Sequence, residues 1–109
     1  MVLTKVGSLT RMPHQVTGID ISPDGKEIVV KFYTKIYYFC MGSRQYGNPG
    51  GAWQDIVDVL TTQPGIEVPY IKEPQGEAVG FGRTFDDGIY TLSEAQGQLT
   101  VPLVHYERL

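Results

Sequence analysis

Short apolar runs alternate with turn-forming residues along most of the chain, a pattern typical of a protein built from many short strands. The stretch from Val16 to Ser22 predicts a strand with Ile19 and Ile21 on one face. SPDG follows it and supplies the residues of a tight turn, so we expect a hairpin. The next run, KEIVVKFYTKIYYF, exceeds the length of a usual strand, and we expect it to divide near Tyr33–Lys35.

The hydrophobic period changes from strand-like to helical in AWQDIVDVL. Four large apolar residues have the spacing of one helix face: Trp53, Ile56, Val57 and Leu60. Asp55 and Asp58 lie on the other face, which we expect to be solvated. The Pro64-Gly65 pair should end the helix, so a helical insertion of two to three turns is predicted near residues 52–62.

The second half of the chain returns to strand-like segments. GIEVPYIKE contains Pro69 and should form an edge strand, and QGEAVGF, IYTLSE and LTVPLVHYERL predict three more strands. The segment from residue 76 to the IYTLSE strand repeats the first hairpin, with RTFDDG in the place of SPDG. The expected correspondences are Ile19 with Val79, Ile21 with Phe81, and Gly25 with Gly88.

Composition narrows the class of protein. A chain of 109 residues with 41% hydrophobic residues should form one globular domain, and 13 Gly with 7 Pro favour an all-β fold. No apolar run is long enough for a membrane span, and the N-terminus lacks the features of a signal peptide, so we expect an intracellular protein if the chain is complete. The single Cys40 lies in an apolar run and is expected to be a buried, inert thiol.

The net charge of −3 argues against nucleic acid as a partner. The charge is unevenly distributed, because residues 1–54 carry +3 and residues 55–109 carry −6. Because the two halves have opposite net charge, the front of one copy could contact the back of another copy. The sequence contains no zinc-ligand spacing, no nucleophile-elbow motif and no phosphate-binding glycine loop.

Three segments, KFYTKIYYF, VPYIKEPQGEAVGF and YTLSE, together with the ISPDGKEIVV hairpin, resemble the last part of a family of six-bladed β-propellers, broadly phytase-like or esterase-like. The resemblance covers residues 14–106. It implies two propeller blades of antiparallel strands, whereas a closed propeller needs four to eight blades. A two-blade unit would expose two apolar faces, so we expect copies to join head to tail into a ring. Three copies would complete six blades, which favours a homotrimer.

The expected organisation is one unit spanning residues 1–109. Residues 14–73 form the first blade with its helix, residues 75–109 form the second blade, and residues 1–9 form a latch strand that completes a blade of another copy.

Candidate site residues follow from the blade arrangement, in which the first strand of each blade lines the central channel. Five residues are expected near one channel mouth and form the predicted ligand site: Thr17, Tyr33, Lys35, Glu77 and Glu94. Repeated carboxylates would repel one another unless a cation binds, so Glu77 and Glu94 are the candidate metal ligands. Channel carboxylates of phytase-like propellers bind calcium, and the resemblance implies calcium here. Alternatively, these carboxylates pair with Lys31, Lys35 or Arg44.

The function favoured by the sequence is a ring-forming protomer that acts as a binding or scaffold module for a small-molecule ligand, without catalytic residues. The alternative is a calcium-dependent hydrolase of the phytase or esterase kind, and a third interpretation is a non-enzymatic fragment of a longer propeller. The tyrosines of the central run either stack on a sugar or pack between blades.

Overall fold

Two antiparallel sheets and one helix make up the part of the chain that the computed structural model describes, namely residues 1–3, 5, 8, 15–42, 52–70, 76–93 and 103–108. The four-stranded sheet has the strand order β1 (Val16–Ile21), β2 (Glu27–Phe32), β3 (Ile36–Cys40) and β4 (Ile66–Val68). The three-stranded sheet has the order β5 (Gly76–Phe81), β6 (Ile89–Ser93) and β7 (Leu103–Tyr106). The predicted mostly-β fold with one helix is confirmed.

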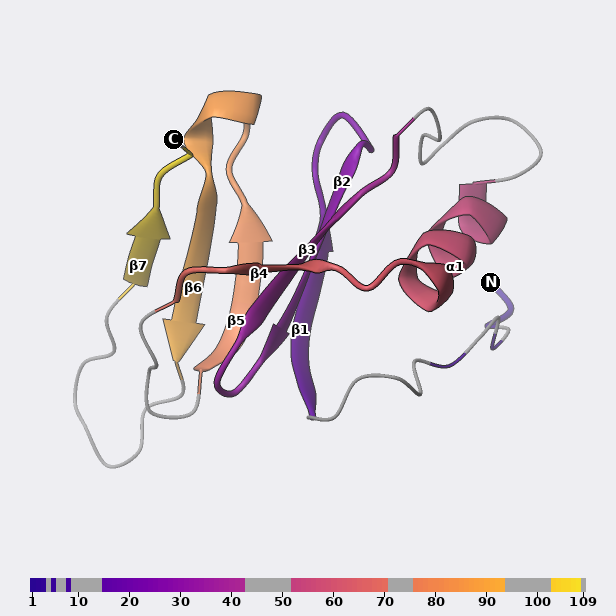
Figure 1. Cartoon of the computed structure of the whole chain (residues 1–109), viewed down its shortest axis with the longest axis horizontal. Helices are drawn as coiled ribbons and strands as arrows, with labels where there is room; N and C mark the ends of the chain where they lie inside the picture. The colour runs from indigo at the N-terminus through magenta and orange to yellow at the C-terminus, as the bar shows by residue number, and fades with distance from the viewer. Residues whose placement is uncertain are drawn as a thin grey trace.

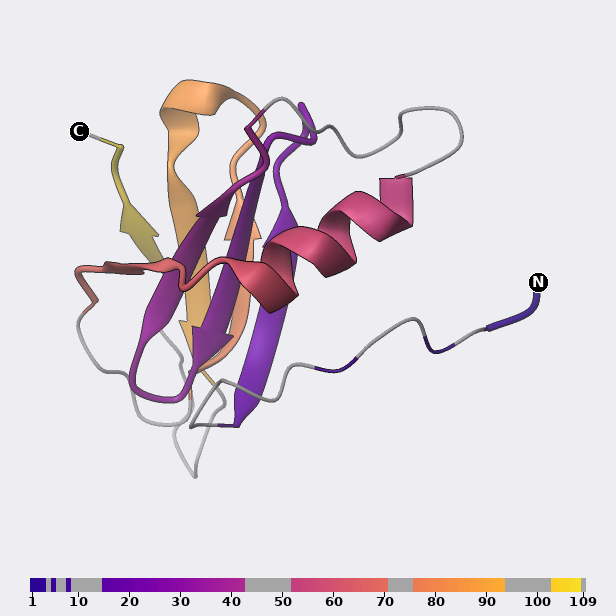
Figure 2. The same cartoon turned by 45° about the vertical axis from the view of Figure 1, so that its right-hand side comes forward.

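Three layers follow one another along the long axis of the molecule. The three-stranded sheet lies at one end, the four-stranded sheet in the middle, and helix α1 (Ala52–Thr62) at the other end (Figure 1). The view in Figure 2 shows α1 running obliquely across the strands of the middle layer. The two termini lie at opposite ends of this stack, beside α1 and beside β7 respectively (Figure 1).

Both predicted turns of the first three strands are present. In SPDG, the Ser22 hydroxyl donates a hydrogen bond to Asp24 Oδ1 at 2.7 Å, and the same oxygen accepts the Lys26 amide at 3.0 Å. Gly25 adopts a φ of 72°, which a residue with a side chain rarely takes. The turn between β2 and β3 needs no glycine, because the Phe32 amide bonds to the Lys35 carbonyl at 2.8 Å.

Helix α1 ends before Pro64, as predicted. The Trp53 side chain lies outside the described structure, and among the side chains that are described the buried face differs from the prediction at one position. Val59 is fully buried, whereas Val57 is only half-buried. Ile56, Val59 and Leu60 form one apolar stripe with helical spacing, and Ile56, Val57 and Leu60 form another. The oblique packing of α1 on the sheet selects the first stripe, which sequence periodicity alone cannot decide.

The four-stranded sheet is covered on both faces, which explains why every residue of β2 is buried. The first core cluster lies between this sheet and α1 and contains Ile28, Val30, Phe32, Phe39, Met41, Val59 and Leu60. The second cluster lies between the two sheets and contains Val29, Ile36 and Ile89, with Tyr38, Val68, Tyr70, Val79, Phe81 and Tyr106 packed against them.

The two sheets repeat one another in register as well as in sequence. Each first strand carries a bulge near its start, at Thr17 in β1 and at Glu77 in β5. The matching cross-strand pairs that follow the bulges are Ile19 with Val30 and Val79 with Thr91, then Ile21 with Ile28 and Phe81 with Ile89. The predicted correspondence of Ile19 and Ile21 with Val79 and Phe81 is therefore confirmed.

The correspondence predicted between Gly25 and Gly88 is wrong by two positions. The Ser22 amide bonds to the carbonyl of Glu27 at 2.9 Å, and the equivalent bond in the second hairpin joins the Gly82 amide to the Gly88 carbonyl at 3.0 Å. Gly88 thus occupies the position of Glu27. The difference arises because the second turn is longer and contains a short 3₁₀ turn, η1 (Phe85–Asp87).

The position of the edge strand agrees with its prediction, whereas the exposure of Cys40 does not. β4 is an outer strand, as predicted, but it ends at Val68, whereas the prediction placed Pro69 within the strand. None of the described residues in segment 1–9 belongs to a strand, and Met1–Leu3 are fully exposed. Cys40 is exposed because it ends β3 on the face opposite the buried Phe39, and this exposure contradicts the expected buried thiol.

Among the described residues, no helix combines the length and apolarity that a membrane crossing requires.

Candidate functional site

The predicted channel-mouth residues that the structure describes lie at one end of the strands. The starts of β1 and β5 and the turn between β2 and β3 share this end, the lower end in Figure 1. Thr17 Oγ1 donates a hydrogen bond to the Lys31 carbonyl at 3.3 Å. Tyr33 is half-buried, and Lys35 Nζ lies 3.8 Å from Glu67 Oε2 within the same sheet. The fold of the backbone thus places Thr17, Tyr33 and Lys35 at the same end of the four-stranded sheet.

The predicted acidic half is only partly covered by the described structure. Glu77 lies at the bulge of β5, but its side chain is outside the description, and Glu94 is outside it altogether. Within the described residues, no group of three or more His, Cys, Asp or Glu side chains is arranged to hold a metal ion. Calcium binding by Glu77 and Glu94 therefore stays a prediction. Arg44, one of their proposed partners, is also outside the described residues.

Lys31 is fully buried between the two sheets, and the sequence analysis did not predict this burial. Its Nζ donates a hydrogen bond to the Phe32 carbonyl at 3.0 Å and lies 4.5 Å from the centre of the Tyr70 ring. A buried ammonium group is costly unless dipoles or charges compensate it, and the carbonyl and the ring both do so. A lysine within a β-branched run is the signal that marks this position.

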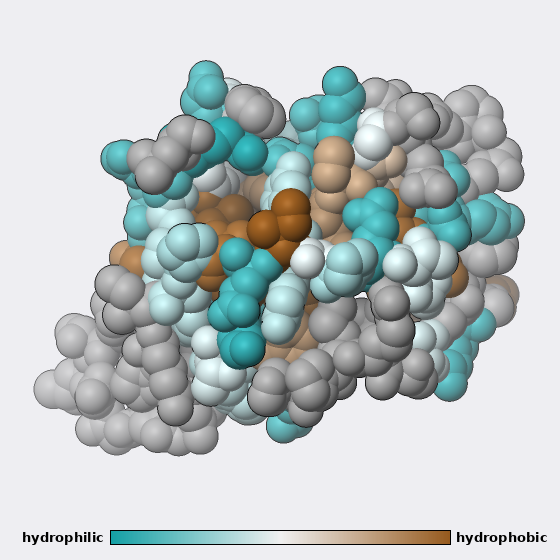
Figure 3. Space-filling view, in the orientation of Figure 1, coloured by the Kyte–Doolittle hydropathy of each residue, from teal (hydrophilic) through white to brown (hydrophobic). Residues whose placement is uncertain are grey.

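A cleft of about 300 Å³ separates the outer parts of the two sheets. Six of its lining side chains are apolar or aromatic: Val29, Tyr38, Val68, Phe81, Ile89 and Tyr106. Figure 3 shows apolar surface in a hollow left of the centre, in the region where the two sheets face each other in Figure 1. The cleft exists because the sheets are close at β1 and β5 and diverge toward β4 and β7.

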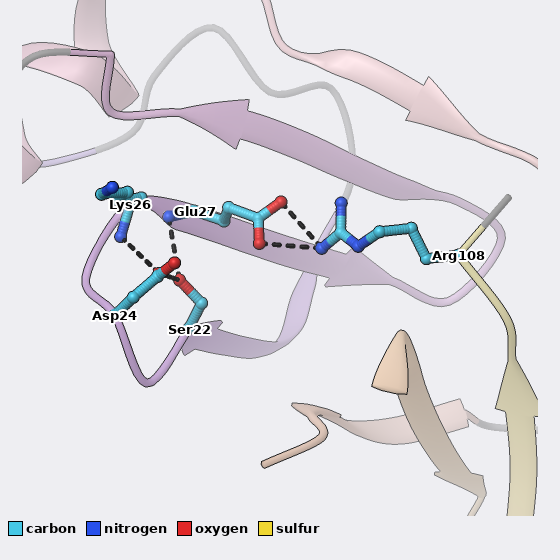
Figure 4. Close-up of polar contacts among 5 residues, drawn as sticks. All are labelled: Ser22, Asp24, Lys26, Glu27 and Arg108. Carbon is cyan, nitrogen blue, oxygen red and sulfur yellow. Dashed lines mark hydrogen bonds and ion pairs between the residues drawn. The ribbon is translucent and has the colours of Figure 1, made fainter. Parts of the chain in front are cut away.

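Arg108, which lines this cleft, belongs to an ion pair that joins the two sheets. Arg108 follows β7, and its Nη2 lies 2.8 Å from both carboxylate oxygens of Glu27 at the start of β2 (Figure 4). The Glu27 side chain is 5% exposed and that of Arg108 is 26% exposed, so the pair is largely shielded from water. Burial, together with the hydrogen-bonded Glu27 carboxylate, raises the pKa of the Tyr38 hydroxyl far above its usual range.

Apolar side chains are exposed on the two outermost faces of the sheets. On β1, Val16 is 41% and Ile19 is 50% exposed. On the three-stranded sheet, Leu92 is 42% and Leu103 is 66% exposed, and these two residues are cross-strand partners. Patches of this kind mark interaction surfaces in many proteins.

The sequence did not predict the cleft or the Glu27–Arg108 pair. Their residues come from strands that are far apart in the chain, and each strand shows only the usual alternation. Comparison with protein-family models, with curated proteins and with solved structures gives no match to the chain. The propeller resemblance therefore stays a prediction, and function is inferred from the geometry of the described residues.

Proposed function

We propose that the chain is a self-assembling protomer that joins head to tail into a closed ring and serves as a binding or scaffold module. The observation that carries this proposal is the match between exposed and buried positions in the two repeats. Leu92 and Leu103 occupy, by register, the positions of Lys31 and Ile36 in the first sheet. Lys31 and Ile36 are both 0% exposed because the three-stranded sheet covers them.

The outer face of the four-stranded sheet, which carries Ile19, provides the other side of the proposed contact. Ile19 corresponds to Val79, and Val79 packs against the four-stranded sheet in the second core cluster. In a head-to-tail contact, Ile19 of one copy would pack on Leu92 and Leu103 of the next, as Val79 packs within one chain. Burying exposed apolar surface in this way favours association.

Helix α1 limits where this contact can form. It covers β2 and β3 on the outer face of the four-stranded sheet, so within the described residues the apolar surface left open on this face lies at the β1 margin. In a propeller the innermost strands of neighbouring blades come closest, which suits a contact confined to β1. The chain also connects outer strand β4 to inner strand β5, as in consecutive blades. These features support a six-bladed ring of three copies.

The N-terminal segment is the proposed latch of this ring. Met1, Val2 and Leu3 expose apolar side chains, and the three-stranded sheet has one strand fewer than the four-stranded sheet within the described residues. A strand from residues 1–9 of another copy would pair with the outer edge of β7 and complete that sheet. Deleting residues 1–9 should therefore weaken the assembly, and an unchanged trimer would contradict the latch.

The channel mouth of this ring is the proposed ligand site. The ring would repeat Thr17, Tyr33, Lys35, Glu77 and Glu94 around one axis, with calcium between the carboxylates. Calcium should raise the melting temperature of the wild type more than that of the Glu77→Gln, Glu94→Gln protein. An equal rise in both proteins would contradict calcium binding by Glu77 and Glu94, and it would not bear on the proposed ring.

Light scattering coupled to size-exclusion chromatography tests the assembly. The wild type should have three times the protomer mass of 12.1 kDa, and Ile19→Asp or Leu103→Asp should each be monomeric. Ile66→Asp is the matched control, because Ile66 is as exposed as Leu103 but lies on neither proposed contact face. A monomeric wild type at high concentration would refute the ring.

Mixing the two variants tests the head-to-tail arrangement itself. Ile19→Asp protein keeps an intact Leu103 face, and Leu103→Asp protein keeps an intact Ile19 face. A heterologous contact predicts that the mixture forms a species of two copies, one of each variant. If each face instead paired with the same face of another copy, each variant alone would form a dimer through its intact face.

A further inference from the structure

We propose that the cleft between the two sheets binds a small, uncharged aromatic molecule whose single polar group points toward Arg108. The cleft belongs to one chain, since both of its walls come from the same protomer. The proposed site is therefore independent of the channel mouth and of the ring, and it should work in a monomeric variant.

The size of the cleft selects a small molecule as its occupant. Its volume of about 300 Å³ is at the lower limit of small-molecule sites, which are roughly 300–1,000 Å³. A β-strand or the face of a second sheet needs a long open groove. Here Arg108 lines the cleft, and its ion pair with Glu27 of the other sheet holds it in place. A single ring system matches this volume better than an extended protein segment does.

The lining selects the chemistry of this molecule. Val29 and Ile89 present aliphatic surface, while Tyr38, Phe81 and Tyr106 present aromatic rings from both sheets. Aromatic side chains on opposite walls favour a flat ring that stacks or packs edge to face with them. An aromatic ligand thus gains more contact than a branched aliphatic molecule of equal volume.

Charge is disfavoured in the ligand for a physical reason. Among the residues that the structure describes, the charged ones lining the cleft are Glu107 and Arg108, both directly after β7, and Glu27 already neutralises Arg108 there. A charged group elsewhere in the cleft would lose its hydration against Val29, Val68 and Phe81. A single polar group can remain near the Arg108 end, where the Tyr38 hydroxyl also lines the wall.

Indole is the probe for this site, because it is a flat, uncharged ring system with one N–H. We expect indole to shift the amide resonances of Val29, Tyr38 and Ile89 in a saturable way in ¹⁵N-labelled Leu103→Asp protein. Indole protons should also show nuclear Overhauser effects to the Val29 and Ile89 methyl groups. Shifts that do not saturate, or contacts only elsewhere in the protein, would overturn the proposal.

A filled cleft gives the second test. Val68→Trp places a bulky ring in the cleft and should weaken indole binding about tenfold or more. Ile66→Trp is the matched control, since Ile66 lies two residues earlier on the same strand and face but does not line the cleft. Equal weakening of indole binding by both variants would refute the site. If Val68→Trp does not fold, the nuclear Overhauser effects between indole and the Val29 and Ile89 methyl groups test the site without it.

Charged analogues of the probe test the remaining part of the inference. Tryptamine and indole-3-acetate carry the same ring with a positive and a negative group. Both should bind more weakly than indole, because each brings a charge into the apolar lining. Tighter binding of either analogue would overturn the uncharged class of ligand.

Discussion

Asp20 on β1 accepts a hydrogen bond through Oδ2 from the backbone amide of Phe81 on β5, at 2.8 Å. β1 and β5 are each the edge strand of their sheet on the side where the two sheets meet. The Phe81 amide points away from β6, because the flanking Gly82 amide bonds to the carbonyl of Gly88, the residue directly before β6. The Asp20 carboxylate thus caps an edge donor and fixes the two sheets at their closest approach.

Replacing Asp20 with Ala should destabilise the protein by about 1–3 kcal/mol, since it leaves a partly buried amide without its acceptor. Asp20→Asn keeps an oxygen at the same position and should lose clearly less unfolding free energy than Asp20→Ala. Urea denaturation followed by circular dichroism measures both. Equal stability of the wild type and Asp20→Ala would show that the bond does not hold the sheets together.

Removing the Arg108 guanidinium should leave the Glu27 carboxylate buried without its main partner. We expect Arg108→Met to cost about 2–4 kcal/mol of unfolding free energy, and Glu27→Gln to cost less. The double variant should be more stable than the sum of the two losses implies, because the interaction can be lost only once. A double-mutant cycle by chemical denaturation measures this coupling, and strictly additive losses would contradict the bridging role.

Gly88 should be the least replaceable turn glycine of the second hairpin. Its φ is 74°, and a Cβ there would lie 2.1 Å from the Tyr106 carbonyl oxygen, so the backbone itself must move. Gly88→Ala should cost about 3 kcal/mol or more. Gly42 also has a positive φ, 63°, but a Cβ there meets nothing within 4 Å, so Gly42→Ala should cost only about 1–2 kcal/mol. Equal melting temperatures for the two variants would contradict the close contact with β7.

Acid should weaken the first turn in a defined way. The hydrogen bond from the Ser22 hydroxyl, helped by the Lys26 amide, lowers the pKa of Asp24 below its ordinary value of 3.8. Because the folded protein favours the carboxylate, its stabilising effect is complete above the ordinary pKa and is lost as the pH falls through the lower folded value.

Ser22→Ala should therefore move the Asp24 pKa back toward 3.8, whereas Ser22→Thr keeps the hydroxyl and should preserve the lowered value. A titration of the Asp24 carboxyl carbon by NMR measures the pKa in the three proteins. An unchanged pKa in Ser22→Ala would show that another group lowers it.

Local patterns predicted the secondary structure well because its causes are local. Alternation and turn chemistry located the SPDG hairpin, the break after Phe32 and the repeat of Ile19 as Val79. Helical spacing located α1 to the residue range observed. Where two stripes shared Ile56 and Leu60, only the direction in which α1 crosses the sheet chose Val59 over Val57.

The sequence by itself determined the strands, the turns, the helix and the internal repeat, because each depends on neighbours within a few residues. The tertiary structure alone decided which groups meet across the two sheets. It buried Lys31, joined Asp20 to Phe81, paired Glu27 with Arg108, and left a cleft where the sheets diverge. Such contacts depend on the angle and separation at which two sheets pack, and no periodicity within a single strand encodes these quantities.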